Sequence, residues 1–168
     1  LPHRQLRNVL SGTAGANVAV LDAALVNGLG LKAVTSIIIS GGIATATVAA
    51  PHAFEPFVCA LVAGASPPSL NGEKVVTATS STTVSWATAE ADGTATGSIS
   101  IKVAPLGWAI AHTGTNLRAY KPTAPEASGS LLRLDDTGTT TCRAVAYESM
   151  TDINTGVGAT PAAMQASG

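Results

Sequence analysis

Histidine, acidic and serine side chains are the groups in this 168-residue chain that could do chemistry, but their spacing assembles no reactive site. None of the three histidines, His3, His52 and His112, has a companion at a spacing typical of zinc ligands. His52 follows a proline in Pro51-His52-Ala53-Phe54, which predicts a structural role in a turn. The chain has neither a GxSxG nucleophile motif nor a glycine-rich phosphate loop. We therefore expect no catalytic, cofactor-binding or metal-binding residue, and no enzyme activity.

One acidic run, Asp135-Asp136-Thr137-Gly138, matches the first half of a calcium-binding loop. It lacks the later glutamate and the alternating acidic spacing of such loops. Predicted strands at 131–134 and 139–147 bracket the run, so it predicts a hairpin turn instead.

The two cysteines, Cys59 and Cys142, each stand in an apolar or alternating segment without a CxxC partner. This pattern predicts two buried thiols that act as small hydrophobic side chains. A disulfide between them stays open as an alternative.

The composition is low in charge: charged residues make 11% of the chain, hydrophobic residues 46%, and mean hydropathy is +0.33. High apolar content with a net charge of −1 excludes disorder driven by charge. Nine basic against ten acidic residues disfavour a nucleic-acid binder that relies on a basic surface. No uninterrupted apolar run approaches 18 residues, which excludes a helical membrane span. A surface with so few charges has little electrostatic repulsion between copies, which favours a chain whose surface is largely covered by other subunits. The alternative is that Ser and Thr hydroxyls alone keep the surface solvated.

Periodicity places these residues on a mainly β framework. Residues 17–27 have helical spacing, with Gly28 suited to end the helix. Residues 33–40 and 43–48 alternate around Gly41-Gly42, which predicts a tight hairpin. Further strands are predicted at 57–62, 74–79, 82–88, 94–103, 106–111, 131–134 and 139–147, and a loop at 119–130.

Short strands at regular spacing predict an antiparallel β-sandwich or barrel with one short N-terminal helix and extended terminal arms. The expected organisation is an N-terminal arm at 1–10, a single β-rich domain at 11–154, and a C-terminal arm at 155–168. Trp86 and Trp108 are the expected aromatic anchors of the core.

Residues 51–76 resemble a small β module that recurs in tailed-bacteriophage structural proteins. The matching pattern is a His-Ala turn, a strand, and then Gly64-Ala65-Ser66-Pro67-Pro68-Ser69-Leu70-Asn71-Gly72. In physical terms, Leu70 would fill the end of the sheet while Asn71 and Gly72 make a tight turn. The surrounding segments 11–30, 92–97, 104–108 and 134–138 resemble one uncharacterised family of tailed-phage virion proteins.

The resemblance implies a non-enzymatic structural component of the virion, assembled in the host cytoplasm. Such a component would assemble in symmetric multiple copies and bridge neighbouring virion proteins at the tail, the neck or the head surface, as a decoration or a head–tail connection. Its partners would be copies of itself and other virion proteins, with no nucleic acid, membrane, small-molecule substrate or cofactor. The alternative is a receptor- or carbohydrate-binding β module at the tail tip.

The N-terminal residues offer the candidate interaction groups. Arg4 and Arg7 stand among the apolar Leu6, Val9 and Leu10 in a segment too short to form its own core. We expect this arm to contact adjacent subunits, with Arg4 or Arg7 pairing with acidic groups of a partner.

Overall fold

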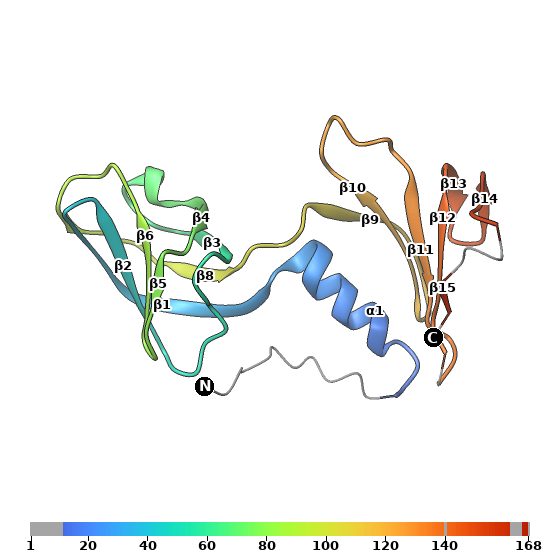
Figure 1. Cartoon of the computed structure of the whole chain (residues 1–168), viewed down its shortest axis with the longest axis horizontal. Helices are drawn as coiled ribbons and strands as arrows, with labels where there is room; N and C mark the ends of the chain where they lie inside the picture. The colour runs from blue at the N-terminus through green and yellow to red at the C-terminus, as the bar shows by residue number, and fades with distance from the viewer. Residues whose placement is uncertain (1–11, 140, 162–165, 168) are drawn as a thin grey trace. The chain divides into compact units, whose positions relative to one another are not determined.

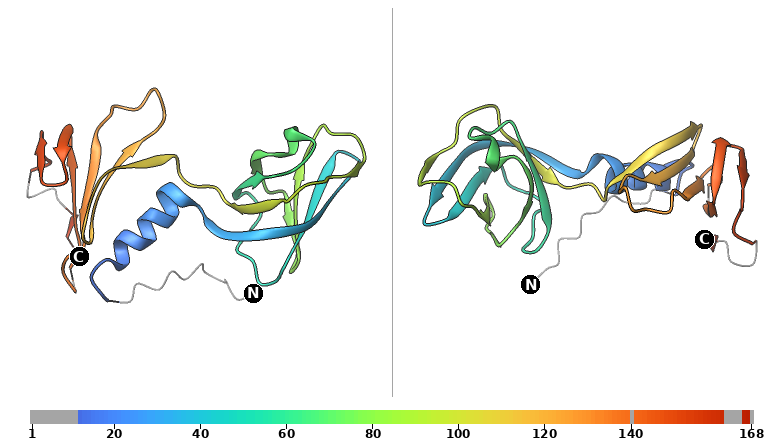
Figure 2. Two further views of the ribbon diagram at one scale, coloured as in Figure 1. Left: turned by 180° about the vertical axis from the view of Figure 1, so that it is seen from behind. Right: turned by 90° about the horizontal axis from the view of Figure 1, so that it is seen from above.

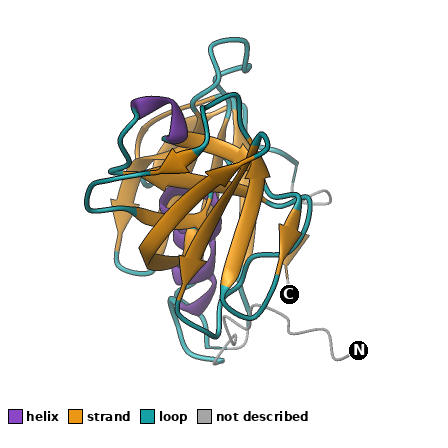
Figure 3. Cartoon of the chain, turned by 90° about the vertical axis from the view of Figure 1, so that its left-hand side faces the viewer, coloured by secondary structure: helices purple, strands orange, loops and turns teal. Residues whose placement is uncertain are grey.

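The computed structural model describes residues 12–139, 141–161 and 166–167 and divides the chain into two compact units. Unit 1 is Gly28–Ala104, and unit 2 combines residues 12–27 with the described residues from 105 onward. The fold class is confirmed: the chain is mainly β, its sheets are antiparallel, and it has one short α-helix (Figures 1 and 3). Where the sequence predicts one domain over 11–154, the structure has two units with separate cores. The predicted arm at 1–10 lies outside the described residues.

Unit 1 is an open antiparallel path of seven strands with an eighth attached, in the order β4-β3-β8-β1-β2-β6-β5, with β7 paired to β1. Its elements are β1 (Leu29–Ser40), β2 (Ile43–Val48), β3 (Cys59–Ala63), the 3₁₀ helix η2 (Pro68–Leu70), β4 (Gly72–Val75), β5 (Ala78–Thr79), β6 (Thr83–Ala87), β7 (Gly93–Thr94) and β8 (Ser100–Val103).

The long strand β1 joins the two halves of this path. Its first part pairs with β8 and its second part with β2, and the register shifts between Val34 and Ser36. Alternate side chains from both halves enter one core, as in a β-sandwich. The core is made by sixteen hydrophobic residues: Ile37, Ile39, Ala44, Ala46, Val48, Phe54, Ala60, Val62, Ala65, Leu70, Val76, Val84, Trp86, Ala95, Ile99 and Ile101.

The predicted β1–β2 hairpin is confirmed. Ser40 pairs with Ile43, and Gly41 and Gly42 between them have φ values of 57° and 78°. Two successive positive φ values are what a two-residue turn needs to match strand twist, and glycine adopts them without strain.

Unit 2 holds a five-stranded antiparallel sheet, in the order β15-β12-β11-β10-β9, and a separate hairpin, β13–β14. Its elements are α1 (Ala16–Leu21), the π-helix η1 (Asp22–Asn27), β9 (Trp108–Gly114), β10 (Leu117–Pro122), β11 (Leu131–Asp135), β12 (Arg143–Tyr147), β13 (Ser149–Asp152), β14 (Thr155–Val157) and β15 (Ala166–Ser167). The helix predicted at 17–27 is present, with its second half wound as a π-helix.

Two sequence-based predictions for unit 2 need correction. Residues 119–122, predicted as loop, are the second half of central strand β10, where Tyr120 is fully buried. The two prolines suggested a loop, but Pro122 only ends the strand. Thr155–Val157, predicted as the start of an arm, pairs with β13.

Each face of the unit 2 sheet is covered. The helical segment packs its Leu21 and Leu25 against a small cluster around Val18, Tyr120 and Leu134, and Figure 2 shows α1 along the sheet in both views. Hydrogen bonds tie the β13–β14 hairpin to the sheet: Arg133 Nε donates to the Ile153 carbonyl at 2.7 Å, and His112 Nε2 lies 3.3 Å from the Met150 carbonyl.

A buried carboxylate joins the helix to the sheet in unit 2. Asp136 is 2% exposed, and its Oδ2 accepts hydrogen bonds from the backbone N–H groups of Asn17 (2.7 Å) and Val18 (3.3 Å). Its Oδ1 accepts a bond from Asn17 Nδ2 at 2.8 Å. The carboxylate thus satisfies N–H groups that the first turn of a helix leaves without partners.

Candidate functional site

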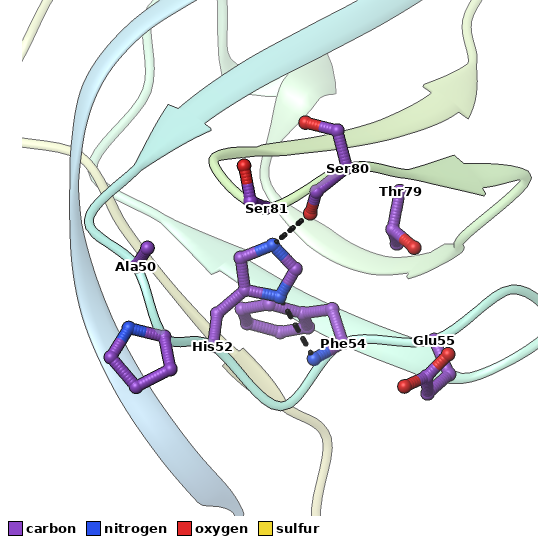
Figure 4. A pocket seen from close by; sticks show the side chains of 8 residues that line it. Ala50, His52, Phe54, Glu55, Thr79, Ser80 and Ser81 are labelled. Atoms are coloured by element: carbon purple, nitrogen blue, oxygen red, sulfur yellow. Dashed lines mark hydrogen bonds between the residues drawn. The ribbon is translucent and has the colours of Figure 1, made fainter. Parts of the chain in front are cut away.

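A pocket of about 460 Å³ opens in unit 1 between two turns (Figure 4). One turn follows β2, where the chain leaves the sheet through Pro51 and returns to the core at Phe54; the other joins β5 to β6. The volume falls within the roughly 300–1,000 Å³ range of small-ligand sites. The lining residues are Ala50, Pro51, His52, Phe54, Glu55, Thr79, Ser80 and Ser81.

His52 connects the two turns and is fixed in one tautomer. Its Nδ1 accepts the Phe54 backbone N–H at 3.3 Å, so Nε2 carries the proton and donates it to the Ser80 carbonyl at 2.7 Å. Figure 4 shows the ring between these partners, above the Phe54 ring. Both ring nitrogens are occupied, which leaves no lone pair for a metal and no base for a serine.

The pocket has no serine nucleophile set against a base. His52 bonds to the carbonyl of Ser80, whereas the Ser80 hydroxyl lies 2.7 Å from Thr83 Oγ1 and accepts backbone N–H bonds within its own turn. The hydroxyl therefore shapes the turn before β6 instead of facing an activating imidazole.

Glu55 is the one charged residue that lines the pocket. Its side chain is exposed, and no hydrogen bond or ion pair joins it to another residue in the described part of the chain. Hydroxyl oxygens of Thr79 and Ser81 add further acceptors. The pocket thus combines apolar walls with a single negative charge.

Two residues beyond Glu55, Phe57 is the most exposed large hydrophobic side chain of the described residues, at 87%. Its φ of 71° lies in the left-handed region, which a bulky residue occupies only at a cost. Its backbone N–H donates to the Val76 carbonyl at 2.8 Å, which fixes the turn before β3. Val75, 61% exposed, follows on the neighbouring strand. Sequence reasoning placed Phe57 inside a buried strand and missed this surface; the preceding Pro56 is the signal that favours a turn.

The residues singled out by sequence as structural separate between the two units. In unit 1, Leu70 is fully buried and Trp86 is 1% exposed. Asn71 accepts the Ala65 backbone N–H at 2.8 Å and donates to the Ala65 carbonyl at 2.7 Å, and Gly72 follows with a φ of 87°. The Asn71 side chain thus closes the proline-rich loop that carries Leu70 into the core.

Trp108 is half-buried in unit 2, against the cluster of Val18, Tyr120 and Leu134. Arg4 and Arg7, the predicted interaction residues, lie outside the described residues.

Both cysteines are free thiols with raised pKa values. Burial is the main cause for each, and a neighbouring carboxylate adds to it: Glu73 beside Cys59, and Asp136 beside Cys142. Both thiols therefore stay protonated and weakly nucleophilic at neutral pH.

The acidic run at Asp135 and Asp136 is used within unit 2. Asp136 faces inward to the helix, while Asp135 accepts a 2.7 Å bond from the Thr137 hydroxyl and lies 3.4 Å from Arg133 Nη1. The Thr137 hydroxyl bond and the Arg133 charge lower the pKa of Asp135. Within the described ranges, no group of three or more His, Cys, Asp or Glu residues is placed to hold a metal ion.

The outer surface formed by the second part of β1 with β2 and β6 carries no charged residue. The register of these strands puts nine residues on it, which we call the hydroxyl face: Ser36, Ile38, Ser40, Ile43, Thr45, Thr47, Thr83, Ser85 and Ala87. Thr45 Oγ1 lies 3.0 Å from Ser85 Oγ across the β2–β6 pair. Ile38 is 55% exposed and Ile43 40%.

Comparison with protein-family models, curated proteins and solved structures gives no match to this chain. In the part of the chain that the structure describes, no helix has the length and apolar character to cross a membrane.

Proposed function

We propose that the chain is a non-enzymatic structural component of a tailed-phage virion that assembles in symmetric multiple copies and bridges neighbouring virion proteins. The hydroxyl face is the observation that carries the proposal. Nine residues on three strands include no charge, so that two such surfaces meet without electrostatic repulsion and without burying an unpaired ion. The exposed Ile38 and Ile43 add apolar area to the contact.

The chemistry of the described residues supports a structural role over a catalytic one. His52 bonds through both nitrogens, and the thiols of Cys59 and Cys142 are held protonated. Asp136 is committed to the start of α1. The resemblance of residues 51–76 to a phage structural module supplies the virion context.

A carbohydrate-binding module receives less support. Such a module needs exposed aromatic rings on which sugars stack. Among the described aromatic residues only Phe57 is largely exposed, while Phe54, Trp86 and Tyr120 are buried.

The test is incorporation of variants into assembled particles, measured by quantitative mass spectrometry. Ile38→Lys puts a charge on the hydroxyl face, at its most exposed isoleucine, and should reduce the copy number severalfold. Ala124→Lys, at an exposed site in unit 2, is the matched control and should be incorporated normally. Normal incorporation of folded Ile38→Lys protein, or recovery of the unaltered chain only outside particles, would contradict the proposal.

A further inference from the structure

The pocket in unit 1 is chemically suited to a basic side chain. Its polar lining is the Glu55 carboxylate with the hydroxyl-bearing residues Thr79 and Ser81. His52 offers no free polar atom there, because both of its ring nitrogens are bonded to backbone groups. A guanidinium group fits such a lining best, since it pairs with carboxylate through two parallel N–H bonds and has further donors for hydroxyls.

Glu55 is also available: no side-chain hydrogen bond or ion pair joins it to another described residue, as is also true of Glu126 and Glu148 in unit 2, whereas five other acidic side chains are engaged within their own unit. The engaged pairs are Asp22 with Arg118, Asp135 with Arg133, Glu90 with Ser69, Asp92 with the Gly41 N–H, and Asp136 with Asn17. A carboxylate beside apolar walls and without a partner favours a cation supplied from outside the unit.

Phe57 adds an apolar contact on the same turn. Its ring is 87% exposed and its backbone is held at a φ of 71°. A strained, exposed aromatic residue is unfavourable in an isolated unit and favourable where it anchors an interface. Glu55 and Phe57 together therefore present an acidic and an aromatic contact two residues apart.

This chain contains a segment with the complementary pattern. Arg4 and Arg7 alternate with the apolar Leu6, Val9 and Leu10. We propose that residues 4–10 of a neighbouring copy bind unit 1 at this turn, with an arginine on Glu55 and an apolar side chain on Phe57. The inference rests on the proposed assembly of multiple copies and names the contact that joins them.

The test is fluorescence anisotropy with an acetylated, labelled peptide of residues 1–11. The receptor is the full chain carrying Arg4→Gln and Arg7→Gln, so that its own segments do not compete. We expect saturable binding that weakens with salt, because the carboxylate is exposed. Adding Glu55→Gln to the receptor should weaken binding by about tenfold, the usual effect of losing a charged hydrogen-bond partner.

Two controls make the result specific. Glu126→Gln removes an exposed carboxylate of unit 2 and should leave the affinity unchanged. A peptide with glutamate at both arginine positions should bind a receptor carrying Glu55→Arg better than it binds the receptor that keeps Glu55. Absence of binding by the arginine peptide, or equal affinity of that peptide for the receptors with and without Glu55→Gln, overturns the inference.

Sedimentation equilibrium of the unaltered chain separates this inference from the function it rests on. Self-association without peptide binding overturns this contact and leaves the proposed assembly standing. A chain that stays monomeric and binds no peptide counts against both.

Discussion

The two units are stabilised by different kinds of core, although both are small antiparallel β structures. Unit 1 buries sixteen hydrophobic residues in one cluster that contains no polar residue. Unit 2 buries three residues in its helix–sheet cluster and also encloses the one buried charged residue of the described chain, Asp136. Packing of apolar surface therefore dominates in unit 1, whereas in unit 2 we expect a set of buried polar bonds to contribute a larger share of the stability.

The polar set of unit 2 includes a second carboxylate. Asp22, in the π-helix, accepts bonds from Arg118 Nε at 3.1 Å and from the Tyr120 hydroxyl at 2.8 Å. Tyr120 thus packs its ring in the core and bonds its hydroxyl to the helical segment. These two bonds fix the helical segment against the sheet of unit 2. They join residues that are 96 and 98 positions apart in the sequence.

The largest change in the free energy of unfolding should come from a substitution in the core of unit 1. Trp86→Ala removes a side chain that is 1% exposed and should lower the free energy of unfolding by about 3–5 kcal/mol through lost burial and a cavity. Urea unfolding followed by β-sheet circular dichroism measures it. Trp108→Ala, at a half-buried site of unit 2, should cost less. A smaller loss for Trp86→Ala than for Trp108→Ala would show that the apolar core of unit 1 is not the main source of its stability.

The next effect should come from the buried carboxylate. Asp136→Ala leaves the N–H groups of Asn17 and Val18 without their partner and should cost about 2–3 kcal/mol. Trp108 fluorescence in a Trp86→Phe background reports on unit 2 during denaturation. Glu126→Ala, at an exposed position of unit 2, is the control and should change little. Equal stability of the Asp136 and Glu126 variants would show that unit 2 does not depend on this bond set.

Tyr120→Phe should have a smaller effect, about 1 kcal/mol at neutral pH, from loss of the hydroxyl bond to Asp22. Burial, and next the Asp22 carboxylate, raise the pKa of Tyr120. The unfolded state therefore ionises first, so this residue's contribution is complete below about pH 10 and is lost as pH rises above it. Unfolding monitored from pH 8 to 11 should show a flatter alkaline decline in Tyr120→Phe. An unchanged decline would assign the alkaline transition elsewhere.

The smallest change in the free energy of unfolding should be a stabilisation. Phe57→Gly relieves a left-handed backbone and should stabilise unit 1 by up to about 1 kcal/mol, since glycine adopts a φ of 71° freely. The same change removes the exposed ring and should weaken association between copies. Thermal unfolding and sedimentation of one sample measure both. A destabilised Phe57→Gly chain with unchanged association would show that the ring serves the fold.

The contrast between the cores explains which features the sequence reveals. The β1–β2 hairpin follows from alternation around Gly41-Gly42, and the same alternation marks Trp86 as an inward residue. The division into two units could not be read this way, because residues 12–27 join residues 105 onward through Asp136 and Asp22. Contacts between residues about 100 positions apart produce no periodic pattern of polarity in the sequence. The Asp135–Gly138 turn was predicted, but the inward role of Asp136 was not.

The candidate pocket was only partly visible in the sequence. His52 was expected to support a turn, and its two bonds are consistent with that role. The contact between His52 and Ser80 exists because β2 and β6, next to which the two turns lie, are paired in the sheet. The sequence does not show this strand pairing. Phe57 is exposed because its own backbone is in the left-handed region. A hydropathy pattern does not reveal this, because phenylalanine has the hydropathy of a core residue.

Sedimentation equilibrium of the full chain over a wide concentration range shows whether copies of the chain associate, as a structural component that works in symmetric copies must. We expect a mass that rises to an integer multiple of 16.6 kDa and a weaker association for Ile38→Lys. A single species of 16.6 kDa at every concentration, identical for the unaltered chain and Ile38→Lys, would contradict the proposed assembly in symmetric copies.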